Sequence, residues 1–259
     1  SHHPFSIFAS KVLAMRSKCT LVFEVRDLWP KSLILLGKLS ANNIGVRVMS
    51  WVESYAYRTA DFTVSVLGNS YQYMRQKGLR PEQFIYIPNG VDLTEQESRA
   101  EDTPLEVDNI LKSAKAKFKF VIGYFGLIGH AQDFSGLFEA LVKDEELNTG
   151  LVIVGDGPKR KSLEAEVSRL NLSGKVFFTG QVEKHQVYSL ISRIDICYLG
   201  LVDSYLFQLG ASPTKLNDYL KAAKPIIYST PWIDPDLQKF CEAVFFCDPG
   251  DPLGAYQAL

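Results

Sequence analysis

Apolar residues in the second half of this sequence occur in short, nearly continuous runs. Each run is followed by a stretch whose apolar positions recur with the period of a helix. The runs cover residues 118–125, 151–154, 176–178, 195–199, 225–228 and 243–247, and the helical stretches end near residues 143, 170, 191 and 223. Strands that are apolar on both faces and alternate with helices are typical of a parallel sheet with helices on both sides. The pattern therefore predicts an α/β fold.

The first half has the same character but fewer strands. Apolar runs at 21–25, 62–66 and 84–87 predict three strands, and residues 50–60 and 70–77 have helical patterns. An average sheet has about five to six strands. Residues 94–117, between the halves, are polar and charged without a strand pattern. We therefore expect a partial N-terminal domain (1–96), a linker (97–117) and a C-terminal domain (118–259).

Both ends of the sequence suggest a cut chain. It opens on Ser1-His2-His3-Pro4 rather than on Met, and residues 254–259 have the pattern of a helix that has barely begun. We expect the N-terminal domain to lack part of its strands and the C-terminal domain to lack its last helices.

Composition and charge narrow the function classes. The chain has 259 residues, of which 46% are hydrophobic and 22% charged, and this excludes collagen-like, disordered and coiled-coil proteins. Residues 1–100 carry a net charge of +4 and residues 101–259 a net charge of −5, which suggests two domains with different partners. The basic half suits an anionic membrane surface, and we expect no nucleic-acid partner. The four cysteines lack metal-ligand spacing, and two lie in apolar runs, so we expect reduced thiols in the cytoplasm.

Candidate ligand-binding residues lie where the predicted strands end. Ligands of parallel α/β sheets bind beyond the carboxyl ends of the strands, and glycines stand there at 126, 129, 155, 157 and 180. Glycine lets the backbone approach a ligand, but it also serves any tight strand-to-helix turn, so both explanations stay open. Gly155-Asp156-Gly157 is not a dinucleotide fingerprint, because Arg160 stands where the third glycine belongs.

The sharpest local signal lies at 210–220. Ser212 can cap a helix whose first residue is Pro213, and Lys215 then lies in the first turn, where N–H groups and the helix dipole favour a phosphate. Asp218 follows on the face of Thr214, where a carboxylate can accept hydrogen bonds from vicinal hydroxyls. The alternative is a capped surface helix with a Lys–Asp pair.

Two acidic motifs have competing explanations. Arg26-Asp27-Leu28-Trp29-Pro30 follows a strand directly, which suits either a binding rim or a local Arg–Asp pair beside a core Trp. Asp234-Pro235-Asp236 has the spacing of a metal motif but fits the start of a helix better.

These residues resemble motifs of the family 4 glycosyltransferases. Residues 210–227 are similar to the donor-site helix of that family, and Val154–Pro158, Phe178–Gly180 and Ile87–Asp92 resemble further motifs in the same order. Phe23–Pro30 resembles the branch that builds bacterial surface polysaccharides such as O-antigen and capsule, near the N-acetylfucosamine transferases. The resemblance covers nearly the whole chain.

The resemblance implies a GT-B fold, with two Rossmann-like parallel-sheet domains that face a cleft. It implies a retaining hexosyltransferase that uses a nucleotide-sugar, with a UDP-sugar expected, and needs neither a metal nor another cofactor. Asp218 matches the second Glu of the family's Glu-x7-Glu motif, whereas Gly210 stands in place of the first. Arg26 or Asp27 occupies the strand end where many members place a catalytic histidine. The expected donor-binding residues are Gly126, Gly129, Gly155, Asp156, Gly157, Gly180, Val182, Ser212, Pro213, Thr214, Lys215 and Asp218.

The leading hypothesis is a cytoplasmic transferase at the inner face of the membrane that acts on a lipid-linked or polysaccharide acceptor. One alternative is a nucleotide-sugar 2-epimerase of GT-B fold, which needs catalytic carboxylates and a histidine; we regard His130 and His185 as incidental. The other is a non-catalytic nucleotide-sugar-binding module, because a carboxylate is absent at position 210 and because sequence is expected to be missing at the N-terminus.

Overall fold

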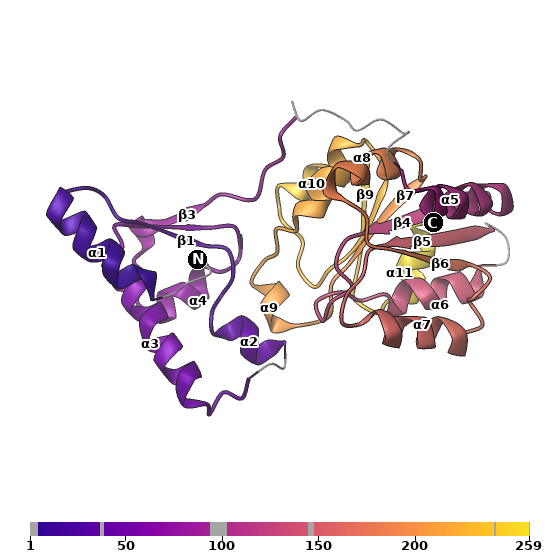
Figure 1. Ribbon diagram of the computed structural model, residues 1–259. Helices are drawn as coiled ribbons and strands as arrows, with labels where there is room; N and C mark the ends of the chain where they lie inside the picture. The colour runs from indigo at the N-terminus through magenta and orange to yellow at the C-terminus, as the bar shows by residue number, and fades with distance from the viewer. Residues whose placement is uncertain (1–4, 37–38, 94–102, 145–147, 241, 259) are drawn as a thin grey trace. The chain divides into compact units, whose positions relative to one another are not determined.

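The computed structural model describes residues 5–36, 39–93, 103–144, 148–240 and 242–258 (Figure 1). The chain divides into two compact units. Ser1–Asn89 and Ser204–Ser212 form the N-terminal unit, and Gly90–Asp203 and Pro213–Leu259 form the C-terminal unit.

The C-terminal unit is built on a parallel sheet of six strands in the order β6-β5-β4-β7-β8-β9. The strands are β4 (Phe120–Phe125), β5 (Thr149–Val154), β6 (Val176–Gly180), β7 (Ile196–Gly200), β8 (Ile226–Ser229) and β9 (Val244–Cys247). Every residue of β5, β7 and β8 is buried, because helices cover both faces of the sheet. The six strands expected from the apolar runs are confirmed.

Helices lie on both sides of this sheet (Figure 1). One face carries α6 (Ser135–Lys143), α7 (Arg160–Arg169) and α11 (Pro252–Gln257), and the other carries α5 (Leu105–Lys117), α8 (Lys184–Ser192) and α10 (Thr214–Lys221). Side chains of α6 and α7 pack with those of β4 and β5 in the main core cluster. The sheet therefore has the two-layer cover that its all-apolar strands require.

Helix α5 occupies most of the segment expected to be a linker. Val107, Leu111 and Ala114 are buried against the sheet at the spacing of one helical face. The many charges on the other face of α5 hide this stripe in the sequence. Residues 97–102 of the expected linker lie outside the described residues.

The N-terminal unit contains a parallel sheet in the order β1-β2-β3, and its three predicted strands are confirmed. The strands are β1 (Val22–Val25), β2 (Phe62–Ser65) and β3 (Phe84–Tyr86). The helices are α1 (Ser6–Ser17), α2 (Lys31–Leu35), α3 (Ile44–Thr59) and α4 (Tyr71–Gln76), with a 3-10 turn at Pro81–Gln83. Helix α3 begins six residues earlier than its pattern suggested, because the Asn43 side chain accepts a hydrogen bond from the Gly45 N–H and caps it.

The segment 204–212, which follows β7, packs in the N-terminal unit. It contains the short helix α9 (Tyr205–Gln208), and Leu206 and Leu209 join the core cluster there. The Asn69 side chain donates to the Gln208 carbonyl over 2.7 Å. Gly210 has φ +107°, and a Cβ on it would lie 2.7 Å from the Gly68 nitrogen. A glutamate therefore does not fit at position 210.

No helix in the described parts of the chain combines the length and the apolar character that crossing a membrane requires.

Candidate functional site

Two adjoining pockets lie at the carboxyl ends of β4, β5 and β6. The first, which we call the α8–α10 pocket, encloses about 450 Å³ between β4, α8 and α10. The second, the glycine-loop pocket, also encloses about 450 Å³ and shares Gly126, Leu127 and Val187 with the first. Each has the size of a site for a small organic ligand. The pockets occupy the strand ends at which the sequence predicts a ligand.

The sequence-predicted donor residues divide between these pockets. Those lining the α8–α10 pocket are Gly126, Thr214, Lys215 and Asp218. Those lining the glycine-loop pocket are Gly126, Gly155, Asp156, Gly157 and Val182. Gly129, Gly180, Ser212 and Pro213 line neither pocket.

Lys215 is a mostly buried cation whose partner is uncharged. Its Nζ donates to the Tyr124 hydroxyl over 2.7 Å and lies 4.3 Å from the centroid of the Tyr124 ring. Burial lowers the pKa of Lys215 from 10.5 to about 8. No carboxylate among the described residues pairs with Lys215, so an anion that enters the pocket would raise the pKa of the lysine back toward its ordinary value.

The side of the pocket next to Lys215 is open to a close approach. A Cβ on Gly126 would lie 3.1 Å from the Lys215 Nζ, so any other residue there would crowd the ammonium group. Gly126 also has φ +129°, a conformation that favours glycine. The absence of a side chain at Gly126 therefore keeps Lys215 accessible at the end of β4.

Ser212 does not cap helix α10, and that prediction was wrong. The helix begins at Thr214 with Pro213 in the capping position, and no side chain caps it. The Ser212 hydroxyl instead accepts a hydrogen bond of 2.9 Å from the Asn89 N–H, and the Asn89 side chain donates to the Ser212 carbonyl. The Ser212 hydroxyl therefore does not act as a side-chain acceptor for the first-turn N–H groups of α10.

Two buried tyrosines fix α10 against the end of β4. The Tyr219 hydroxyl accepts a hydrogen bond of 3.0 Å from the Phe125 N–H, and the two rings meet edge to face. The Tyr124 hydroxyl donates to the Leu127 carbonyl over 2.6 Å, which leaves its oxygen to accept from Lys215. Both positions look like ordinary core residues in the sequence, so the pattern gave no signal of this role.

The glycines at 155 and 157 are explained by packing between two loops. A Cβ on Gly155 would lie 1.9 Å from the Gly126 carbonyl oxygen, and one on Gly157 would lie 2.4 Å from that of Ile128. The Ile128 N–H donates to the Asp156 carbonyl over 2.9 Å, which joins the loops. The two loops can therefore meet only because Gly155 and Gly157 have no side chains, and this holds whether or not a ligand binds in front of the loops.

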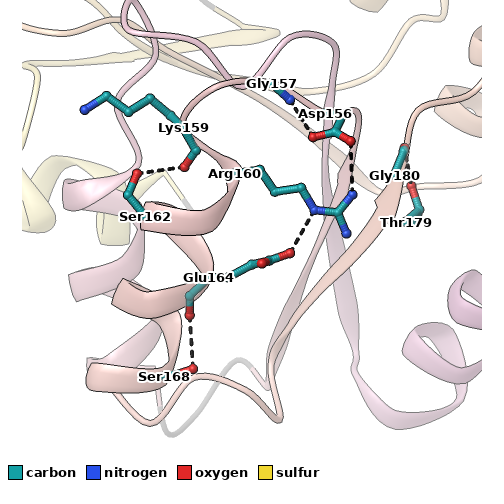
Figure 2. Close-up of polar contacts among 9 residues, drawn as sticks. All are labelled: Asp156, Gly157, Lys159, Arg160, Ser162, Glu164, Ser168, Thr179 and Gly180. Carbon is teal, nitrogen blue, oxygen red and sulfur yellow. Dashed lines mark hydrogen bonds and ion pairs between the residues drawn. The ribbon is translucent and has the colours of Figure 1, made fainter.

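Arg160 takes a structural place in the same loop (Figure 2). Its Nε donates to Glu164 over 2.8 Å, and its Nη1 lies 3.5 Å from the Asp156 carboxylate. Asp156 also accepts a hydrogen bond of 2.7 Å from the Gly157 N–H. Arg160 therefore ties the loop to α7 and holds the carboxylate of Asp156, which lines the glycine-loop pocket.

Helix α8 contributes pocket residues that the sequence analysis missed. Lys184, His185 and Tyr188 line the α8–α10 pocket. The Lys221 Nζ lies 5.3 Å from the Tyr188 ring centroid and donates to the Asp92 carbonyl over 2.9 Å. His185, which the sequence analysis regards as incidental, is thus a lining residue of the pocket. The signal available in the sequence was its place five residues after Gly180, the glycine at the end of β6. The Nδ1 atom of His185 lies 3.3 Å from the Glu183 carboxylate.

The charges of the pocket lining favour an anionic ligand. Three lysines, at 184, 215 and 221, line the α8–α10 pocket, whereas Asp218 is its one acidic lining residue. A pocket with this excess of cations attracts negatively charged ligands.

Arg26 and Asp27 lie in the N-terminal unit, directly after β1, and both are exposed. Asp27 and Trp29 line a small cavity next to Glu53, whose side chain is only 4% exposed. Burial raises the pKa of Glu53, which accepts hydrogen bonds from the hydroxyls of Tyr57 and Tyr73.

Asp234 behaves as the helix-start explanation predicted. It accepts a hydrogen bond of 2.8 Å from the Asp236 N–H, and its carbonyl accepts from Leu237 at the start of a 3-10 turn.

Comparison with known sequences agrees with the location of the pockets. The sequence model of the family described as "Glycosyl transferases group 1" matches residues 108–232. A probable glycosyltransferase of Pseudomonas aeruginosa, WbjE, is 27% identical over 213 residues, 80% of this chain and 50% of the relative. The 2-deoxystreptamine glucosyltransferase of Streptomyces kanamyceticus is 28% identical over 130 residues, 49% of this chain and 32% of the relative. The chain thus spans half or less of the length of these relatives.

Solved structures show the same architecture. HepE of Anabaena, crystallised with UDP, aligns with a TM-score of 0.69 at 17% sequence identity. The alignment covers 97% of this chain and 65% of the HepE chain. Sucrose-phosphate synthase of Thermosynechococcus elongatus has a TM-score of 0.71 at 17% identity, with coverage of 99% and 61%. The fold is therefore GT-B, with two Rossmann-like parallel-sheet units. The segment that matches the family model contains the residues that line both pockets.

Proposed function

We propose that this protein is a retaining glycosyltransferase of the hexosyl type that takes its sugar from a nucleotide-sugar, with a UDP-sugar as the expected donor. The acceptor would be a lipid-linked or polysaccharide chain in cell-surface glycan synthesis. The observation that carries the proposal is the buried Lys215 ammonium, which has an uncharged partner in a cationic pocket at the strand ends.

The diphosphate of the donor would bind at Lys215 and at the uncapped N-terminus of α10. The first-turn N–H groups and the positive end of the helix dipole stabilise negative charge. Sugar transfer leaves a nucleoside diphosphate, on which charge develops in the transition state. Fixed donors aimed at that charge stabilise it, so Lys215 and the helix end would do so without a metal or another cofactor.

The remaining donor contacts follow from the two pockets. Asp218 lies one turn along α10 in the pocket of Lys215, where its carboxylate would accept hydrogen bonds from the ribose hydroxyls. The glycine-loop pocket adjoins it, and Val182, which lines that pocket two residues after the end of β6, would lie beside the base. Gly129, Gly180 and the segment that begins at Ser212 would shape the backbone around the donor.

The N-terminal unit would supply the acceptor side. Arg26 and Asp27 lie directly after β1, at the strand end where many members of the family that the sequence resembles place a catalytic histidine. Both side chains are exposed, so both charges are accessible. We propose these two as the catalytic residues. Retention of configuration rests on the same resemblance.

The related proteins support the choice of donor and acceptor. HepE has been crystallised with UDP and with UDP-glucose, and WaaG, with a TM-score of 0.60, is a glycosyltransferase involved in lipopolysaccharide biosynthesis. The resemblance of Phe23–Pro30 favours the N-acetylfucosamine transferase type. A lipid-linked acceptor favours a cytoplasmic location at the inner face of the membrane.

A panel of UDP-, GDP- and dTDP-sugars tests this function. Binding is measured by calorimetry, and release of nucleoside diphosphate is measured with and without lipid-linked acceptors. We expect a UDP-sugar to bind most tightly and turnover to require no added divalent cation. Failure of every nucleotide-sugar to bind would refute the proposal.

A second candidate is a non-catalytic nucleotide-sugar-binding module. Position 210, where the family's first Glu makes its sugar contact, holds a glycine that packs against the 67–69 loop. Binding without hydrolysis or transfer, with acceptors present, would favour the module.

A further inference from the structure

The Tyr124 hydroxyl links two groups at the Lys215 end of the α8–α10 pocket. It donates to the Leu127 carbonyl over 2.6 Å and accepts from the Lys215 Nζ over 2.7 Å. A hydroxyl carries one hydrogen, and because the Leu127 carbonyl takes it, Lys215 meets only the lone pairs of the oxygen. One side chain therefore fixes both the ammonium group and the backbone of Leu127.

The core of the C-terminal unit holds Tyr124 in place. Its side chain is fully buried in the main core cluster, and its ring meets that of Phe134 edge to face with the centroids 4.9 Å apart. Burial raises the pKa of Tyr124, so the hydroxyl keeps its proton over the pH range in which Lys215 titrates. The position of this hydroxyl is therefore set by core packing and not by a ligand.

Both groups that Tyr124 fixes keep hydrogen-bond donors for a ligand. An ammonium group has three N–H donors, and Tyr124 is the one hydrogen-bond partner of the Lys215 Nζ in the described part of the chain. The Leu127 N–H has no acceptor among the described residues. The N–H groups of its neighbours donate within the chain over 2.9–3.0 Å, at Gly126, Ile128 and Gly129. Leu127 and Lys215 both line the α8–α10 pocket, so their remaining donors are available there.

We propose that Tyr124 is a positioning residue of the donor site. Its hydroxyl holds the Lys215 ammonium and the Leu127 backbone in the arrangement that receives the diphosphate of the donor, so both are in place before the ligand binds. Donors that are already fixed need no ordering when the charged ligand arrives. The inference rests on the proposed function, because it takes the anion at Lys215 to be the diphosphate of a nucleotide-sugar.

Tyr198 provides a matched control in the same core. It is also buried in the main core cluster, its ring lies 5.5 Å from that of Phe134, and its hydroxyl donates to the Asp133 carbonyl over 2.8 Å. Among the described residues, no lysine bonds to this hydroxyl. Tyr124→Phe and Tyr198→Phe therefore each remove a buried hydroxyl that donates to a loop carbonyl, but only Tyr124→Phe removes the acceptor of Lys215.

Binding of UDP and of uridine at pH 7 separates the diphosphate from the rest of the nucleotide. Calorimetry measures the affinity of the full chain for UDP, and an NMR shift titration measures that for uridine. We expect Tyr124→Phe to weaken UDP binding about 5- to 20-fold, the scale of one hydrogen bond. Uridine binding should change less than twofold, because uridine has no phosphate. Tyr198→Phe should change neither affinity more than twofold, and circular dichroism verifies that each variant is folded.

A double substitution tests whether Tyr124 acts through Lys215. Residues that act through one another are not additive. In the Lys215→Met background, the loss of UDP affinity caused by Tyr124→Phe should therefore be at least threefold smaller than in the wild type. An equal loss in both backgrounds would show that Tyr124 acts independently of the lysine and would overturn the proposal.

A measurement without nucleotide reports on the pairing directly. The lysines are labelled with carbon-13 at Cε, and the Lys215 signal, identified by its absence from Lys215→Met, is followed between pH 6.5 and pH 11. A hydrogen bond to the ammonium group favours its charged form, so Lys215 should titrate at a lower pH in Tyr124→Phe than in the wild type. In Tyr198→Phe it should titrate at an unchanged pH. The other titratable side chains that line this pocket are the same in all three proteins: Lys184, His185, Tyr188, Asp218, Tyr219 and Lys221.

Four results would each overturn the role of Tyr124 while leaving the proposed function standing. They are unchanged UDP binding by Tyr124→Phe, an equal loss in Tyr198→Phe, an equal loss of uridine affinity, and an unchanged titration of Lys215. Failure of the proposed function is distinct from these, because the wild type itself would then bind no UDP, and this inference would fall with it.

Discussion

Replacing Lys215 by Met tests whether the buried charge of Lys215 gives the pocket its affinity for an anion. Methionine keeps most of the length and apolar stem of the lysine but removes its charge. Burial lowers the pKa of Lys215 from 10.5 to about 8, so the folded chain without ligand holds this ammonium at a cost. We expect Lys215→Met to make the protein more stable and to weaken its nucleotide binding, a trade that is common at functional sites.

The size of the gain follows from the pKa shift. A shift of about 2.5 pH units corresponds to about 3 kcal/mol near pH 7. The hydrogen bond and the ring contact with Tyr124 offset about 1 kcal/mol of this, because the variant loses them. Lys215→Met should therefore raise the free energy of unfolding by about 2 kcal/mol, or the unfolding temperature by about 4–8 °C.

The pH dependence gives the sign of the effect independently. Between pH 8 and 10.5 the unfolded state holds the lysine proton and the folded state has released it, so the stability of the wild type rises with pH. The difference in free energy of unfolding between Lys215→Met and the wild type should therefore fall by about 2 kcal/mol between pH 7 and pH 9.5. Urea unfolding at both pH values measures this, with Lys161→Met, which removes an exposed lysine of α7, as the control.

Two results would refute the reasoning. A Lys215→Met variant that is less stable than the wild type at pH 7 would show that the ammonium stabilises the folded pocket. A stability difference that stays constant from pH 7 to pH 9.5 would show that Lys215 titrates near its ordinary pKa.

Three further substitutions test the surroundings of Lys215. Gly155→Ala should cost about 2–4 kcal/mol of stability in urea unfolding, because its Cβ would meet a carbonyl oxygen at 1.9 Å, whereas Gly90→Ala, with open space around it, should change stability by less than about 0.5 kcal/mol. Tyr219→Phe should cost about 1–3 kcal/mol in the same assay, since the buried Phe125 N–H loses its acceptor; an unchanged midpoint would contradict this. Asp218→Asn should reduce the preference for UDP over 2′-deoxy-UDP about tenfold in calorimetry, and an unchanged ratio would remove Asp218 from the ribose site.

The sequence predicted the strands well because strands buried on both faces leave continuous apolar runs. The first strand expected in the C-terminal half, 118–125, became β4 at Phe120–Phe125, and the others ended within two residues of their predicted bounds. Helix α5 was harder to recognise, because only Val107, Leu111 and Ala114 face the sheet and charges surround them. This face of α5 is buried only once the strands of the C-terminal unit have assembled into a sheet, and the local sequence pattern of the helix does not show that contact.

The candidate site was predictable to the level of the loops but not of the contacts. Strand-end position brought Lys215 and Asp218 into one pocket, as the spacing suggested. The cap at Ser212 failed because Asn89, 123 residues away in sequence, takes its hydroxyl. The tyrosine that holds Lys215 lies 91 residues from it, and the pocket lining on α8 comes from a different crossover. Such pairings arise only when the strands assemble.

The most direct test of the central claim is the affinity for UDP of three proteins, measured by titration calorimetry at pH 7. These are the wild type, Lys215→Met and the control Lys161→Met. We expect the wild type and the control to bind UDP equally well and Lys215→Met to bind about 10- to 100-fold more weakly, the scale of one charge-assisted hydrogen bond. Equal affinity in all three proteins, or no binding of UDP by the wild type, would contradict the assignment of the α8–α10 pocket to the donor diphosphate.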